Sequence, residues 1–174
     1  MDFLELAAAR YSVRKFEAKP VEQEKLDQIL KAGQLAPTAC NNQPQRVLVL
    51  NEADKLEALK GCTRFTFGAP LVLVVCYDKN TSWKRKADGQ DMGTVDASIV
   101  ATHMLLEIAN LGLGTTWVGC FDPQKLIEIF KLPENLVPIA VLPVGYPDKA
   151  AEPNPNPLHS KRLGLDETTV YNEF

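Results

Sequence analysis

Basic and hydroxyl side chains recur at every second position near the start of the chain. The segment RYSVRKF places Arg10, Ser12 and Arg14 two residues apart, directly after a predicted helix. Alternate side chains of an extended segment project to the same side. Two guanidiniums and one hydroxyl suit a phosphate, because they offer bidentate charged donors beside a neutral donor. The spacing therefore predicts an anion site, and a solvated basic loop is the plain alternative.

A stiff, amide-rich loop is the second candidate for chemistry. Residues 36–44, APTACNNQP, hold two asparagines and a glutamine between two prolines, ahead of an apolar run. Side-chain amides offer both donors and acceptors, so a loop that holds them in fixed positions can form hydrogen bonds with the polar edge of a flat ligand. Cys40 is the loop residue that could act as a nucleophile, but the local sequence offers no histidine or helix N-terminus to activate it.

Several glycines and two further basic clusters are also candidates for binding a ligand. The glycine spacing of GLGTTWVGCFD, residues 112–122, differs from both the dinucleotide fingerprint and the P-loop. Gly112 and Gly114 are interpreted as a helix end and a strand start, whereas Gly119 would let a flat ligand approach the backbone closely. The clusters WKRK at 83–86 and HSKR at 159–162 have solvated charge as their plain alternative.

The other polar residues point to structure rather than to chemistry. Asp96 and His103 lie in an apolar helical run, where we expect a structural partner for the carboxylate and a core position for the imidazole. With two histidines in the chain, a Ser/His/Asp triad has little support. The four cysteines form no C-x-x-C pair, so we expect reduced thiols and no metal site.

The elements that must position these residues follow from hydrophobic period and caps. The run PLVLVVCY, residues 70–77, predicts a strand buried on both faces, and the helix at 92–112 is apolar almost all round. We predict α+β architecture with a mixed central β-sheet flanked by helices. The predicted helices are 2–10, 21–36, 52–61, 92–112 and 122–131, and the predicted strands are 46–51, 70–77, 114–119 and 136–145.

Composition limits the class of protein. The chain has 174 residues, 45% hydrophobic, with a formal net charge of −3, which fits one domain and speaks against a nucleic-acid surface. No signal sequence and no apolar run of membrane-spanning length is recognised, so we expect a cytoplasmic protein that binds no membrane. Residues after 145 are rich in proline and cannot form a core of their own, so they are either disordered or laid along another surface.

The motifs together resemble one family. R-x-S-x-R, P-T-A-x-N-x-Q-P, GLGTTWVG and LPVGYP occur here in an order and spacing similar to those of the nitroreductase family of FMN-dependent NAD(P)H oxidoreductases. The resemblance runs nearly end to end. It implies an intertwined homodimer of single domains, residues 1–174, in which the extended tail 148–174 wraps the partner subunit. The second face of the apolar helix would then be the dimer interface.

The resemblance also implies roles for individual residues. Arg10, Ser12 and Arg162 would hold the FMN phosphate, and Arg14 would reach the pyrimidine end of the ring. Trp117 and Gly119 would lie at the ring, near its N5 edge. From the other subunit the amide loop would line the cofactor with Pro37, Thr38, Ala39, Asn41 and Gln43. Two positions depart from the family pattern: Ser160, for which Lys161 could substitute, and Gln45 after the Q-P pair.

The implied activity is centred on the flavin. NAD(P)H would pass hydride to flavin N5, and a small acceptor such as a nitroaromatic, quinone or activated alkene would then be reduced in a ping-pong sequence. No catalytic side chain is required. The alternatives are an FMN carrier or sensor without NAD(P)H turnover, reductive dehalogenation or oxygen-dependent flavin breakdown on the same scaffold, and a non-flavin thiol protein using Cys40 or Cys120.

Overall fold

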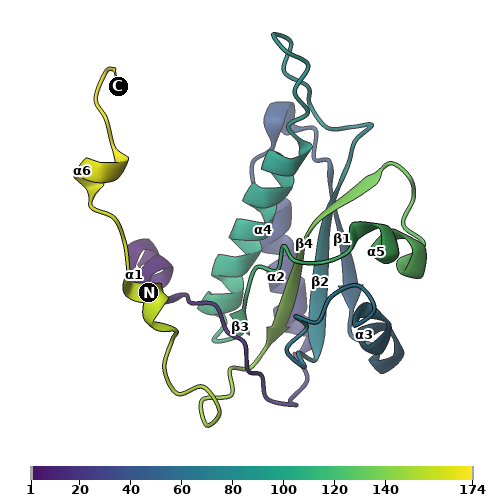
Figure 1. Cartoon of the computed structure of the whole chain (residues 1–174), viewed down its shortest axis with the longest axis vertical. Helices are drawn as coiled ribbons and strands as arrows, with labels where there is room; N and C mark the ends of the chain where they lie inside the picture. The colour runs from purple at the N-terminus through teal and green to yellow at the C-terminus, as the bar shows by residue number, and fades with distance from the viewer. Residues whose placement is uncertain (1, 174) are drawn as a thin grey trace.

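Helices pack on both faces of a single sheet in the computed structural model, which describes residues 2–173 (Figure 1). Helices α2 and α4 cover one face of the sheet, and α3 and α5 cover the other. The elements in chain order are α1 (Phe3–Ala9), α2 (Gln23–Leu35), β1 (Gln45–Leu50), α3 (Ala53–Leu59), β2 (Leu71–Asp78), α4 (Gly93–Asn110), β3 (Gly114–Thr115), α5 (Pro123–Phe130), β4 (Leu136–Gly145) and α6 (Leu165–Thr168), with short 3₁₀ turns at Ala39–Asn41 and Pro157–Ser160.

The sheet has the strand order β1-β2-β4-β3, and neighbouring strands pair antiparallel. The α+β architecture is thereby confirmed. In the described part of the chain, parallel pairing occurs at one isolated bridge, between Ser12 and Thr115. The sheet is therefore mixed only where the N-terminal segment joins its β3 edge.

The central strand β2 is buried along its whole length, as the continuous apolar run predicts. Because alternate side chains point to opposite faces, Leu71, Leu73 and Val75 pack toward α2 and α4. Val72, Val74 and Cys76 pack toward α3 and α5. One strand thus contributes to both halves of the core, which fixes its place in the middle of the molecule.

Helix α4 packs tightly on β2 at its start. A Cβ added at Gly93 would overlap the ring of Tyr77, so only glycine fits at this contact. The helix ends before Gly112, whose φ of +73° is the left-handed conformation that glycine adopts most readily. Both ends of α4 are therefore defined by specific residues.

The predicted strand at 114–119 is shorter in the structure, and its early end has a chemical cause. Gly114 and Thr115 pair with β4, and Val118 bridges Val141 in the same register. In that register Thr116 faces Pro143, which has no N–H to donate to the ladder. The pairing is interrupted there, and Trp117 is left exposed.

The proline-rich tail begins on the body and then leaves it. Phe16 bridges Pro147, and the N–H of Asp148 donates to the carbonyl of Lys15 at 3.0 Å. Beyond the turn at Pro157–Ser160 the tail stands apart from the body (Figure 1), and its leucines 163 and 165 are exposed. Within residues 2–173, no helix combines the length and apolar character needed to cross a membrane.

Candidate functional site

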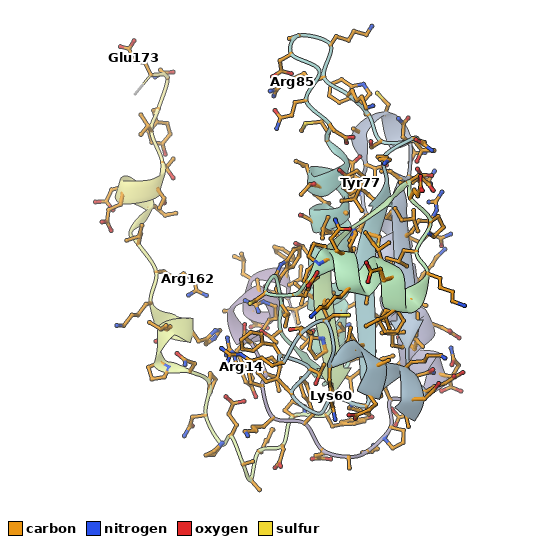
Figure 2. All side chains as sticks on the ribbon, turned by 45° about the vertical axis from the view of Figure 1, so that its right-hand side comes forward. Arg14, Lys60, Tyr77, Arg85, Arg162 and Glu173 are labelled. Atoms are coloured by element: carbon orange, nitrogen blue, oxygen red, sulfur yellow. The ribbon has the colours of Figure 1, made fainter. Side chains whose placement is uncertain are left out.

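An arginine cluster forms where the tail returns to the N-terminal segment. Arg10, Ser12, Arg14 and Arg162 line one cavity of about 260 Å³. Arg162 is far from the other three in sequence, and the turn at Pro157–Ser160 carries it there. In Figure 2 its side chain extends from the tail toward the side of the body that carries Arg14. The structure thus brings together Arg10, Ser12 and Arg162, which the resemblance assigns to the phosphate, and Arg14, which it assigns to the ring.

Contacts of His159 hold this part of the tail in place. The Nε2 atom of His159 lies 3.1 Å from the carbonyl oxygen of Ala8, at the end of α1. The imidazole also meets the ring of Tyr11 edge-on, with ring centroids 6.1 Å apart. HSKR is a basic cluster by sequence, and in the structure its histidine is the residue that docks the turn on α1 and Tyr11.

The cluster carries an excess of positive charge. Among the described residues, none of the three arginines forms an ion pair. The Nη1 atom of Arg14 donates to the carbonyl of Ser12 at 3.2 Å. One carboxylate lies nearby, because Glu152 accepts the backbone N–H of Arg14 at 3.1 Å. Burial, and then the charge of Glu152, raises the pKa of Tyr11. Three guanidiniums without counter-ions suit a dianionic group such as a phosphate monoester.

The amide loop is held in an unusual backbone conformation. Cys40, Asn41 and Gln43 have φ values of +52°, +53° and +51°, in the left-handed region that residues other than glycine rarely adopt. Thr38 Oγ1 accepts the N–H of Gln43 at 3.1 Å, which closes the loop on itself. Backbone strain of this kind clusters at functional sites, because a surrounding structure must maintain it.

Links to other elements fix this loop. Asp96 of α4 accepts the N–H of Ala39 at 2.9 Å, and Asn42 donates to the carbonyl of Thr81 at 3.0 Å. The partner expected for Asp96 is therefore the loop itself. The side chains of Asn41 and Gln43 stay exposed.

The arginine cluster and the amide loop lie at opposite ends of α4. Ala39 contacts Asp96 near the start of the helix, whereas Arg10 lines a small cavity with Ala109 and Gly112 at its end. Asp96 and Ala109 are separated by about 20 Å along the axis, at about 1.5 Å per residue. One copy of the chain therefore does not bring the two predicted parts of the site together.

Trp117 and Gly119 follow β3 and face open space. A Cβ placed on Gly119 would meet nothing nearer than Trp117 Nε1, at 3.9 Å. Gly119 also lines an open pocket of about 640 Å³ with residues 60–65 and 120–122. Thr63 Oγ1 donates to the carbonyl of Cys120 at 2.7 Å and ties the two walls together. No motif in the sequence points to residues 60–65, of which 60 and 61 end the helix predicted at 52–61.

A long apolar groove runs along the face of α4 that points away from the sheet. It has a volume of about 920 Å³ and includes exposed Phe3, Leu35 and Val95. His103 lines this groove half-buried rather than lying in the core, which corrects the expectation from sequence. The other lining residues are Leu6, Ala32, Thr94, Ser98, Ile99, Thr102, Leu106, Glu107 and Asn110.

Two of the four cysteines are buried in the core, and the other two are exposed on the surface. Burial raises the pKa of Cys76 to about 12, and it also raises the pKa of Cys62. Cys40 and Cys120 are exposed. Among residues 2–173, no group of three His, Cys, Asp or Glu side chains could hold a metal ion.

Comparison with known proteins now identifies the scaffold. The model of a family described as the nitroreductase family matches residues 7–62 and 53–146, which together span most of the chain. The chain belongs to the nitroreductase family. The match includes the arginine segment, the amide loop and β3, whereas Arg162 lies outside it.

Individual members of the nitroreductase family are similar over most of their length. A protein of Methanothermobacter thermautotrophicus, provisionally named NADH dehydrogenase/NAD(P)H nitroreductase, is 31% identical over 154 residues, 84% of this chain and 78% of its own. The crystal structure of a nitroreductase family protein from Clostridium difficile 630 has a TM-score of 0.92 and 40% identity over 100% of both chains. An FMN-dependent nitroreductase from Clostridium difficile R20291 has a TM-score of 0.80 and 27% identity over 99% of this chain and 100% of its own.

Proposed function

We propose that this nitroreductase-family protein is an FMN-dependent oxidoreductase that takes hydride from NAD(P)H and reduces a small acceptor. The observation that carries the proposal is the cavity in which Arg10, Ser12, Arg14 and Arg162 meet without a paired carboxylate. The names of the Methanothermobacter relative and of the R20291 structure support the donor and the cofactor respectively.

The residues present fit both the phosphate end and the ring end of FMN. Arg10, Ser12 and Arg162 would bind the phosphate, and the charge excess of the cavity favours a dianion there. The open space beside Gly119 leaves room for a flat ring against the backbone. Bound FMN would supply the N5 atom that accepts hydride and later releases electrons to the acceptor.

The protein's own part is to bind, orient and stabilise charge. Arg14 would place its guanidinium at the pyrimidine end of the ring and stabilise the negative charge that develops on reduction. Gly119 is part of the open pocket formed by residues 60–65 and 119–122, so donor and acceptor would bind in turn on the same face of the flavin ring. That arrangement gives ping-pong kinetics. Nitroaromatics, quinones and activated alkenes are the acceptor classes we propose.

We further propose that the working unit is a homodimer. The amide loop and the arginine cluster lie at opposite ends of α4, so a second copy would have to supply the loop to complete a site. The apolar groove along α4 supports this proposal. It exposes Phe3, Leu35 and Val95, and a second subunit would remove these apolar side chains from water. The tail, residues 148–174, would wrap the second subunit, since Leu163, Leu165 and Tyr171 are exposed on a segment that stands off its own body.

An absorption spectrum of the purified protein tests the proposal. We expect flavin bands that bleach on anaerobic addition of NADH or NADPH and return when a quinone is added. Flavin bands that neither nucleotide bleaches would favour a carrier or sensor. A colourless protein that FMN does not reconstitute would refute the proposed cofactor and leave the exposed thiols of Cys40 and Cys120 as the alternative chemistry.

A further inference from the structure

Asp96 carries a buried carboxylate that is only half satisfied. The residue is 2% exposed and lies near the start of α4. Its Oδ1 accepts the N–H of Ala39 at 2.9 Å, whereas its Oδ2 has no hydrogen-bond partner among the described residues. Burying a carboxylate that is not fully paired is costly, so an apolar side chain would be better if this position served only the core.

The position of the accepted N–H explains what the carboxylate does. Ala39 directly precedes Cys40 and Asn41, the first residues with left-handed backbones. The other links of the loop hold its later residues. Thr38 Oγ1 accepts the N–H of Gln43 within the loop, and Asn42 donates to the carbonyl of Thr81. Arg46 of β1 donates to the carbonyl of Gln43 at 3.1 Å, and the N–H of Asp78 at the end of β2 donates to the carbonyl of Pro44 at 2.8 Å. The Asp96 bond ties the start of the strained segment to the helix that packs on the sheet.

The same helix turn faces the apolar groove. Val95 precedes Asp96 in sequence, and Ile99 lies one turn further along; both line the groove that the proposed second subunit would cover. A helix that is fixed by an interface on one side and holds the loop on the other would set where Asn41 and Gln43 point. Those exposed amides are the part of the loop available to a ligand.

We propose that Asp96 is a positioning residue that presets the amide loop for FMN through its hydrogen bond to the N–H of Ala39. This inference rests on the proposed function, because it assigns the loop's ligand. The role requires an acceptor atom rather than a negative charge. Asparagine therefore fulfils it, and alanine does not.

The test compares three variants of the 174-residue chain. Asp96→Ala removes the acceptor, Asp96→Asn keeps an oxygen that can accept, and Val100→Ala trims a buried residue one turn further along α4 that packs toward α2. FMN affinity is measured by quenching of flavin fluorescence on the apoprotein. Hydrogen exchange of the amides of residues 39–43 is measured without FMN, and mass is measured by light scattering.

We expect Asp96→Ala to weaken FMN binding at least tenfold and to speed exchange at residues 39–43, with the mass unchanged. Asp96→Asn should stay within about threefold of the parent in both readouts, and Val100→Ala should change neither. Equal FMN affinity in Asp96→Ala and the parent would overturn the inference, as would an equal loss in Val100→Ala. If the parent itself binds no FMN, the proposed function fails, and the exchange data still decide whether Asp96 presets the loop.

Discussion

Val13 donates its backbone N–H to the carbonyl of Thr115 at 3.0 Å, and this bond seats the arginine segment on the edge of the sheet. Ser12 forms its parallel bridge to Thr115 at the same place. The side chain of Val13 is buried, so Ser12 and Arg14 on either side of it are turned toward the cavity. The pairing of this segment with Thr115 thus directs the alternate side chains Ser12 and Arg14 into one anion-binding cavity.

Gly114→Ala should disturb the packing of the arginine segment against β3. A Cβ at this position would lie 2.6 Å from Val13 Cγ2, which forces the segment or the strand to move. Overpacking of this kind costs about 1–3 kcal/mol of unfolding free energy. Urea unfolding followed by circular dichroism measures the loss.

Gly119→Ala is the matched variant with the opposite outcome. Its added Cβ meets only open space, so the free energy of unfolding should change by no more than about 0.5 kcal/mol. FMN affinity should fall, since the methyl group would occupy the room proposed for the ring. Unfolding losses of equal size in the two glycine variants would contradict this account of both positions.

Arg14→Ala should slow flavin reduction and weaken FMN binding. Loss of one donor to a developing anion typically costs about 10²–10³ in rate, which sets the upper range expected for the reduction rate. Stopped-flow absorbance after mixing with NAD(P)H measures it. Lys15→Ala is the control, because Lys15 is an exposed neighbouring cation that does not line the arginine cavity. A reduction rate and flavin content near those of the parent would remove Arg14 from the proposed role.

Val95→Glu should disrupt the proposed dimer. Val95 is 43% exposed on the groove face of α4, so a glutamate there can be solvated in a folded monomer but not in a closed apolar interface. Light scattering should give half the parent's mass, and FMN should be lost with it. Glu128→Lys, on the exposed side of α5, should leave the mass unchanged. A parent protein that is itself monomeric with bound FMN would contradict the two-chain site.

Tyr146→Phe should destabilise the fold in a pH-dependent way. The hydroxyl of Tyr146 donates to Glu22, and the hydrogen bond it provides lowers the pKa of Glu22 to about 2. A lowered carboxyl pKa stabilises the fold above the unfolded-state value of about 4.3, and that contribution is lost as the pH falls through about 2. The unfolding free energies of parent and variant should therefore differ most at neutral pH and approach each other toward pH 2. The hydrogen bond from Lys25 Nζ to the same hydroxyl, at 3.0 Å, leaves a remainder that does not change with pH in this range.

Chemical denaturation at pH 7, 4 and 2.5 measures this convergence. Tyr171→Phe is the control, since that ring is 83% exposed on the tail. In the parent, Lys19 Nζ lies 3.8 Å from the centroid of the Tyr146 ring. The phenylalanine variant keeps an aromatic ring under that ammonium group, so it isolates the contribution of the hydroxyl. A difference that is constant with pH would show that Glu22 is not the group involved.

Thiol labelling should divide the cysteines into two pairs. Cys40 and Cys120 are exposed and should react rapidly with a disulfide reagent in the native protein. Cys62 and Cys76 are buried with raised pKa values and should react only on unfolding. The double variant Cys40→Ser, Cys120→Ser should keep its NAD(P)H turnover. Loss of turnover with FMN still bound would assign chemistry to a thiol instead.

The sequence by itself determined the local elements and the types of residue at the site. The apolar run of β2 required burial on both faces, and Asp122 with Pro123 marks the start of α5, where Asp122 accepts two backbone N–H groups. The alternation of Arg10, Ser12 and Arg14 indicated an anion site. Each of these signals is contained within a few residues, because helix caps, turns and side-chain period depend on near neighbours.

Tertiary structure alone decided which distant residues meet. It brought Arg162 to the cavity of Arg10, gave Asp96 the N–H of Ala39 as its partner, and ended β3 early by placing Pro143 opposite Thr116. It also separated the amide loop from the arginine cluster by most of the length of α4. Strand register and the path of the tail fix these relationships. Both depend on packing between segments that are far apart in the chain, so no local sequence pattern encodes them.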